Sequence, residues 1–202
     1  MDMFEAMEKR YSCRNYLKRR VSEEDLALIL DAGAKAPNAG NLQNWIFIIA
    51  RDENKKEQLT KASLNQRWMM GSDLFIIICS DSEPSKRFYS EKGKTYDMQN
   101  CAAAAENMLL MAAAIGLGAC WVGSFNQEAV SRILKLPGNI TPQAVITLGY
   151  PAEKYKKEKR SSLDAFTHFE EYGNKISDQT LAKKLSSDLK TLYQRIPRER
   201  KK

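Results

Sequence analysis

Residues 36–45, Ala-Pro-Asn-Ala-Gly-Asn-Leu-Gln-Asn-Trp, gather amide side chains in one short stretch. Asn and Gln each carry hydrogen-bond donors and an acceptor on one planar head. This chemistry suits the edge of a heterocycle that alternates C=O and N–H groups, as a flavin ring does. Pro37 and Gly40 favour a defined loop shape between a helix and a strand. The alternative is an ordinary polar connection, because Asn and Gly are common turn residues.

A second polar segment, Arg10-Tyr11-Ser12-Cys13-Arg14, places two guanidinium groups on either side of a hydroxyl. Arg matches phosphate oxygens with a planar fork, and Ser adds a neutral donor. The segment is therefore a candidate phosphate site, and the alternative is a solvated basic turn.

Apolar periodicity predicts the elements that would hold these segments. Ser22 is typical of a helix start, and Asn126 of another. We expect helices over 3–10, from 22 to the loop at 36, over 55–64, over 96–115 and after 126, and strands over 45–50, 74–79, 119–122 and 144–148. Residues 80–95 are expected to form a long polar loop, a candidate lid or dimer contact. This order predicts an α+β fold with a small sheet around a buried helix.

Composition narrows the class of protein. The 202 residues, 43% hydrophobic and 28% charged, suit one domain with a sizeable core. Four scattered cysteines and one histidine argue against a zinc site, a disulfide framework or a histidine-dependent hydrolase. No apolar run reaches membrane length, and the acidic start is unlike a signal peptide. We therefore expect a cytoplasmic protein that contacts no membrane.

The net charge of +7 is concentrated at the C-terminus. Residues 151–202 hold 14 Lys/Arg against 8 Asp/Glu, a net charge of +6. An amphipathic helix is predicted within this tail, over 179–194. Aromatic residues are not interleaved with the basic ones, since only Tyr193 qualifies beyond residue 174, so we expect no nucleic-acid partner.

Four motifs together resemble the nitroreductase family of flavoenzymes. They are Arg10-x-Ser12-x-Arg14, Ala36-Pro-Asn-Ala-Gly-Asn-Leu-Gln-x-Trp45, Gly116-Leu-Gly-Ala-Cys-Trp-Val-Gly-Ser124 and Leu148-Gly-Tyr-Pro151, in the family's order and spacing from about residue 3 to 170. The resemblance implies a nitroreductase-like FMN-binding α+β fold, with a small, mixed, mainly antiparallel sheet around a central helix, in an intertwined homodimer. It implies a domain over 1–174, followed by a basic, partly helical extension over 175–202.

The resemblance also assigns cofactor-binding residues. Arg10, Ser12, Arg14 and Arg160 match the positions that hold the FMN phosphate and ribityl chain. Pro37, Asn38, Asn41 and Gln43 match the loop on the isoalloxazine ring, partly from the partner subunit. Val122, Gly123 and Ser124 match the segment whose backbone faces the reactive edge of the flavin. No metal and no catalytic side chain are expected, since flavin N5 is the reactive centre.

The implied activity is ping-pong hydride transfer from NADH or NADPH through FMN to a small-molecule electron acceptor such as a nitroaromatic or quinone. The alternative is a flavin-binding redox sensor or carrier without turnover. Asn44 departs from the family pattern, which often has proline there, and Cys13 fills a position that is often basic or aliphatic. His168 is expected to be structural or on the surface, and Trp121 and Phe125 either line the substrate face or pack in the core.

Overall fold

The computed structural model describes residues 2–153 and 160–175. Helices and short 3₁₀ turns alternate with strands along the chain. The α-helices are α1 (Met3–Lys9), α2 (Glu23–Ala34), α3 (Glu53–Ala62), α4 (Ser82–Tyr89), α5 (Gly93–Ala114) and α6 (Gln127–Leu134). The 3₁₀ turns are η1 (Ala39–Asn41), η2 (Arg67–Gly71), η3 (Ser90–Lys92) and η4 (Leu163–Ala165). The strands are β1 (Tyr16–Leu17), β2 (Trp45–Ala50), β3 (Leu74–Asp81), β4 (Gly118–Val122) and β5 (Ile140–Pro151).

The strands form one sheet in which every paired strand of the described chain runs antiparallel to its neighbour. β5 pairs with β3 and with β4, β3 pairs with β2, and the two residues of β1 pair with the end of β5. A separate parallel bridge joins Ser12 to Ala119. The predicted small, mainly antiparallel sheet is confirmed.

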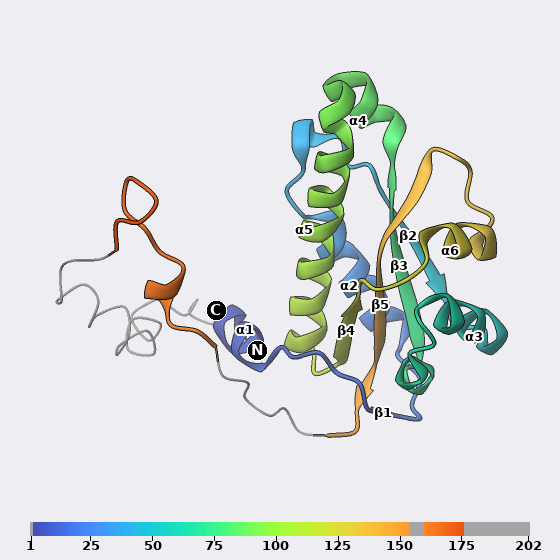
Figure 1. Cartoon of the computed structure of the whole chain (residues 1–202). Coiled ribbons are helices and arrows are strands. Elements are labelled where there is room, and N and C mark those ends of the chain that lie inside the picture. The colour runs from blue at the N-terminus through green and yellow to red at the C-terminus, as the bar shows by residue number, and fades with distance from the viewer. Residues whose placement is uncertain (1, 154–159, 176–202) are drawn as a thin grey trace, which may run out of the picture. The chain divides into compact units, whose positions relative to one another are not determined.

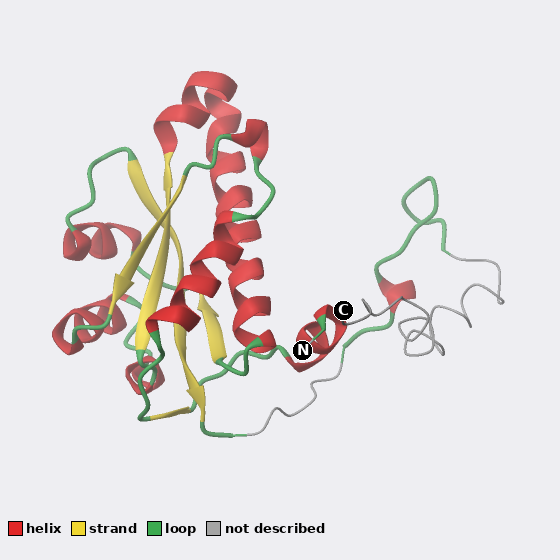
Figure 2. Cartoon of the chain, turned by 180° about the vertical axis from the view of Figure 1, so that it is seen from behind, coloured by secondary structure: helices red, strands yellow, loops and turns green. Residues whose placement is uncertain are grey.

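Both faces of the sheet are buried, which explains the uninterrupted apolar run of β3. Leu74, Ile76 and Ile78 lie in one core cluster with residues of α2 and α5. Phe75, Ile77 and Cys79 lie in a second cluster, with Leu59 of α3 and Val130 of α6. Figures 1 and 2 show α5 and α2 on one side of the sheet and α3 and α6 on the other. The predicted central helix is therefore α5, packed along one face.

The helix starts follow the predicted capping residues. The Ser22 hydroxyl accepts a hydrogen bond from the Asp25 amide at 3.0 Å, and Asn126 Oδ1 accepts from the Ala129 amide at 2.8 Å. Each cap satisfies an amide that the first turn of a helix leaves without a partner.

The long loop predicted over 80–95 is wrong, because this segment contains α4 and η3. The Asp81 carboxylate accepts from the Glu83 amide at 3.0 Å and caps α4. Pro84 falls in the first turn, where proline is tolerated, and Lys86 and Arg87 lie in the last turn, where positive charge is favourable. These capping signals were present in the sequence, although the segment has little apolar periodicity.

The chain divides into two units, residues 1–155 and 156–202. In the second, the described residues are 160–175, with η4 and a turn in which His168 Nδ1 accepts from the Gly173 amide at 2.7 Å. The domain boundary predicted near residue 174 lies inside this unit and stays a prediction. The helix predicted over 179–194 lies outside the described residues. Among the described helices, none combines the length and apolar character that a bilayer-spanning helix needs.

Candidate functional site

The amide-rich loop begins after α2 and ends at β2, and its backbone is unusual. Gly40, Asn41 and Gln43 all adopt positive φ angles, of 57°, 53° and 49°. Glycine tolerates this left-handed region and asparagine enters it more readily than most residues, whereas a residue such as Gln43 costs about 1–2 kcal/mol there. A loop with Asn41 and Gln43 in this conformation therefore needs contacts that hold it.

Two buried asparagines supply these contacts, Asn44 at the end of the loop and Asn100 on α5. Asn100, on α5, accepts from the Ala39 amide through Oδ1 at 2.9 Å and donates through Nδ2 to Asn44 Oδ1 at 2.8 Å. Asn44 donates through Nδ2 to the Asp97 carboxylate at 2.6 Å and to the Asp81 carbonyl at 2.8 Å. Asn44, Asp97 and Asn100 are only 3–5% exposed. Sequence reasoning missed this network, and the departure from proline at residue 44 was its one visible sign.

The loop presents hydrogen-bonding groups to solvent. Asn41 and Gln43 are exposed, and Gln43 Nε2 donates to Asn41 Oδ1 at 3.2 Å. Within the described part of the chain, Asn41 Nδ2 and Gln43 Oε1 have no protein partner. Asn38 instead supports the loop, since its Oδ1 accepts from the Gln43 amide at 2.8 Å. Pro37 is exposed at the start of the loop. The loop therefore offers one donor and one acceptor side by side.

The basic segment, residues 10–14, comes before this loop in the chain and lies between α1 and β1. Arg10 caps the end of α1, and its Nε atom lies 4.0 Å from the Glu106 carboxylate. Ser12 and Arg14 are exposed, and the Arg14 guanidinium lies 5.6 Å from the centre of the Trp68 ring. The Cys13 amide donates to the Ala119 carbonyl at 3.0 Å, which fixes the segment beside β4.

Cys120, on β4, lies behind this segment and is 2% exposed. Burial raises the pKa of its thiol, while the charge of Arg14 and a hydrogen bond with Ser12 act in the opposite direction. The bridge between Ser12 and Ala119 places Ser12 next to β4, and Arg14 follows two residues later in the same segment.

Val122, Gly123 and Ser124 follow at the end of β4. Val122 is buried in the second core cluster, whereas Gly123 and Ser124 are exposed. Gln66 Nε2 donates to the Ser124 carbonyl at 3.4 Å. Because Trp68 of the same turn contacts Arg14, the structure brings Arg14 and Ser124 to one region. Sequence reasoning missed Gln66 and Trp68.

The other residues singled out in the sequence differ from one another in exposure and in contacts. Arg160 is exposed and belongs to the second unit, so its part in a phosphate site stays a prediction. His168 stacks on Tyr172 with ring centres 4.6 Å apart and lies 3.1 Å from Lys175 Nζ. Trp121 is 38% exposed, whereas Phe125 packs against the second core cluster.

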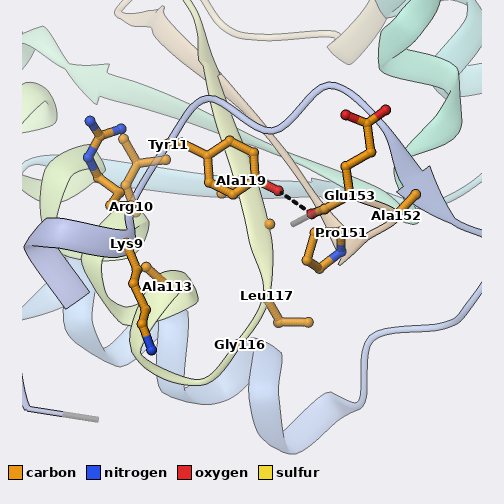
Figure 3. Close-up of a pocket in the computed structure, with 12 residues that line it drawn as sticks. Lys9, Arg10, Tyr11, Ala113, Gly116, Leu117, Ala119, Pro151, Ala152 and Glu153 are labelled. Carbon is orange, nitrogen blue, oxygen red and sulfur yellow. Dashed lines mark hydrogen bonds between the residues drawn. The ribbon is translucent and has the colours of Figure 1, made fainter. Parts of the chain in front are cut away.

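A pocket of about 600 Å³ opens beside the basic segment (Figure 3). Its walls come from the end of α1, the last turns of α5, the start of β4 and the end of β5. The Tyr11 hydroxyl donates to the Glu153 carbonyl at 3.1 Å, and burial raises the pKa of Tyr11. Arg10 is the one predicted site residue among the described residues that line this pocket.

The residues present fit FMN in two places. Exposed Ser12 and Arg14, with Arg10 nearby, match a phosphate in charge and in donor type. The Asn41 donor and the Gln43 acceptor match the alternating edge of the isoalloxazine ring.

Comparison with known proteins decides the family. The model of the nitroreductase family matches residues 7–68 and 60–150. A protein of Archaeoglobus fulgidus whose name proposes an NADH dehydrogenase/NAD(P)H nitroreductase is 35% identical over 164 residues, which cover 77% of this chain and 90% of that protein. The chain belongs to the nitroreductase family.

Two further comparisons agree with this family assignment. The FMN reductase (NADPH) of Bacillus subtilis is 24% identical over 181 residues, covering 83% of this chain and 73% of that protein. The crystal structure of a nitroreductase family protein from Clostridium difficile is 27% identical with a TM-score of 0.75, covering 85% of this chain and 99% of that one. The predicted family and fold class are confirmed, and so is the enzyme class of an NAD(P)H-dependent oxidoreductase.

Proposed function

We propose that this nitroreductase is an FMN-dependent enzyme that oxidises NADH or NADPH and reduces a nitroaromatic, a quinone or a related oxidised small molecule by a ping-pong mechanism. The proposal depends on one observation: a chain of this family exposes two groups of hydrogen-bonding side chains. One set, Ser12 and Arg14, suits a phosphate, and the other, Asn41 and Gln43, suits a flavin edge. When bound, FMN supplies hydride acceptance and donation at N5.

The residues of the chain would then bind FMN and orient its ring. Arg14 and Arg10 would neutralise the phosphate charge, and Ser12 would donate a hydrogen bond to a phosphate oxygen. Asn41 and Gln43 would fix the orientation of the ring edge. Gly123 is exposed and has no side chain, so backbone N–H groups at this point can approach a bound ring closely. Orientation and electrostatics of this kind are the protein's usual contribution in a cofactor enzyme.

A homodimer is part of the proposal. Asn100 anchors the amide-rich loop, whereas Ala113 and Gly116 near the other end of α5 border the pocket that contains Arg10. Ala113 lies thirteen residues after Asn100 in α5, a rise of about 20 Å, and Figure 1 shows η1 and α1 toward opposite ends of α5. We therefore propose that the loop of one copy completes the flavin site of a second copy.

Exposed apolar side chains support this dimer. Met3 and Met7 on α1 are 67% and 50% exposed, and Met98 on α5 is 53% exposed. Light scattering at several protein concentrations tests this part of the proposal, because a monomer at every concentration contradicts it. A reducing cytoplasmic location is also proposed, supported by four free, buried thiols.

An absorption spectrum of the purified protein, before and after addition of NADH or NADPH, tests the main proposal. Flavin bands that bleach with either nucleotide and return with a quinone or nitroaromatic are expected. A flavin that binds but is never reoxidised by these acceptors would favour the sensor or carrier alternative. A protein that cannot be loaded with FMN would contradict the cofactor assignment.

A further inference from the structure

The hydrogen bonds that hold the amide-rich loop use most of the donor and acceptor groups on the Asn44 and Asn100 side chains. Asn44 uses both of its amide hydrogens and its oxygen, on Asp81, Asp97 and Asn100. Asn100 uses Nδ2 on Asn44 and Oδ1 on the Ala39 amide. Both amide orientations are therefore fixed by their partners, since a flipped head would place acceptors against acceptors and donors against donors.

The anchored backbone carries the strained residues. Ala39 is held by Asn100 at the start of η1, and Asn44 is held directly after Gln43. Between these two points lie the positive φ angles of Gly40, Asn41 and Gln43. Local strain of this kind persists where the surrounding structure over-determines the conformation.

Tyr89 of α4 also contacts the loop. The Tyr89 hydroxyl, from the end of α4, lies so close to Gly40 that a Cβ at residue 40 would be only 2.4 Å away. Tyr89 is itself packed edge-on against Tyr96 of α5, with ring centres 4.7 Å apart. The loop is therefore held between α4 and α5.

Asn44 also connects the loop to α4 through the backbone. Its carbonyl accepts from the Asp81 amide at 2.7 Å, and its Nδ2 donates to the Asp81 carbonyl at 2.8 Å. Asp81 caps α4. The position of the loop is thus tied to the start of the same helix that supplies Tyr89.

We propose that Asn44 and Asn100 are positioning residues, which hold the loop so that Asn41 Nδ2 and Gln43 Oε1 point together toward the flavin ring. This inference rests on the proposed function, because it names how the chain orients that cofactor. Neither residue needs to touch the flavin. Their effect is transmitted through the backbone of residues 39–43.

Three variants separate this role from a general effect on folding. Asn100→Ala removes both loop contacts of Asn100. Asn100→Ser keeps a small polar group and serves if the alanine variant does not fold. The matched control is Asn107→Ala, on the same helix, where Asn107 Nδ2 donates to the Ala32 carbonyl of α2 at 3.0 Å and forms no hydrogen bond with the loop in the described chain.

The first measurement is amide hydrogen exchange over residues 38–44 in the FMN-free protein. We expect exchange in this segment to be at least about tenfold faster in Asn100→Ala than in the parent, intermediate in Asn100→Ser, and unchanged in Asn107→Ala. Equal protection in Asn100→Ala and the parent would overturn the inference, whatever the cofactor proves to be.

The second measurement is FMN titration together with the visible circular dichroism of the bound flavin. For Asn100→Ala we expect an FMN Kd about tenfold higher and an altered visible dichroism, and for Asn107→Ala the parent values. A loop that exchanges faster while the Kd and dichroism stay at parent values would overturn the positioning role. A parent chain that takes up no FMN would overturn the proposed function and the flavin part of this inference, whereas the exchange result still decides whether Asn100 holds the loop.

Discussion

Gly93, the first residue of α5, lies directly against the backbone of Ser85 in α4. A Cβ built at residue 93 would be 2.8 Å from the Ser85 carbonyl carbon, 2.9 Å from its oxygen and 3.0 Å from the Lys86 nitrogen. These are backbone atoms, so a rotamer change cannot relieve the overlap. The packing of α4 on α5, and with it the place of Tyr89 over the loop, depends on the absence of a side chain at residue 93.

Gly93→Ala is therefore expected to destabilise the protein although alanine is the better helix former. Helix propensity alone favours alanine by about 1 kcal/mol, but overpacking costs about 1–3 kcal/mol, and here the backbone must move. We expect a net loss of stability and a lower melting temperature, by about 2–4 °C for each kcal/mol lost. Thermal unfolding followed by circular dichroism measures it.

Gly138→Ala is the control for this change, because Gly138 is exposed and a Cβ there meets no atom within 4 Å. Its melting temperature should stay close to that of the parent. An equal or higher melting temperature in Gly93→Ala than in Gly138→Ala would show that α4 is not packed on α5 as described.

Features that depend on local sequence were predicted well. The strand over 45–50 was found at its exact bounds, and Ser22 and Asn126 cap their helices, because caps and apolar runs are encoded within a few residues. β5 begins at Ile140 and includes Pro151, so it is longer than the predicted 144–148. Its ends are set by pairing with β3 and β1, which a short window cannot show.

The candidate site was predicted only in part for the same reason. The exposed side chains of Asn41 and Gln43 could be found from residue type. Their support could not, since Asn44 meets partners 53 and 56 residues further along the chain. The contact of Gln66 with Ser124 spans 58 residues. Such contacts depend on tertiary packing, for which the sequence offered only the absence of proline at residue 44.

Replacing Arg14 by alanine tests the phosphate assignment. The change removes a charge-assisted contact worth about 1.5–3 kcal/mol, so FMN affinity should fall about tenfold or more. Arg20→Ala is the control, because Arg20 is an exposed arginine of the same N-terminal region that pairs with Glu23 at 3.2 Å. Titration of each variant with FMN gives the comparison. If Arg14→Ala binds FMN as tightly as Arg20→Ala, the phosphate lies elsewhere.

Alkaline pH should destabilise the protein through its buried thiols. Burial raises the pKa of Cys79 and of Cys101 from about 9 to about 12. Between these values the folded chain keeps both thiol protons while the unfolded chain loses them. The free energy of unfolding therefore falls as pH rises from about 9 to 12, by about 1.4 kcal/mol per pH unit for each thiol, and is unaffected by these groups below that window.

Urea unfolding at several pH values, in the presence of a phosphine reductant, measures this slope. The double variant Cys79→Ala/Cys101→Ala has a lower baseline stability, since both thiols lie in the core, but its dependence on pH should be flatter. Tyr16, whose pKa burial also raises, is present in both proteins and contributes equally. An identical pH slope in the parent and the double variant would contradict the assignment.

Two ion pairs on α3 should differ in their importance, because only one of them involves a buried charge. The Lys56 side chain is 2% exposed, and its ammonium donates to Glu53 at 2.9 Å and to the Ser72 carbonyl at 2.7 Å. Lys61 and Glu57, one turn later, form a pair at 2.8 Å in which both side chains are about half exposed.

Glu53→Gln leaves a buried ammonium without a counter-charge and should cost about 1–2 kcal/mol, allowing for the exposed position of Glu53. Glu57→Gln should leave the urea midpoint close to that of the parent, because solvent already screens that pair. Equal midpoints for the two variants would mean that water reaches Lys56 and that the charge is not buried in solution.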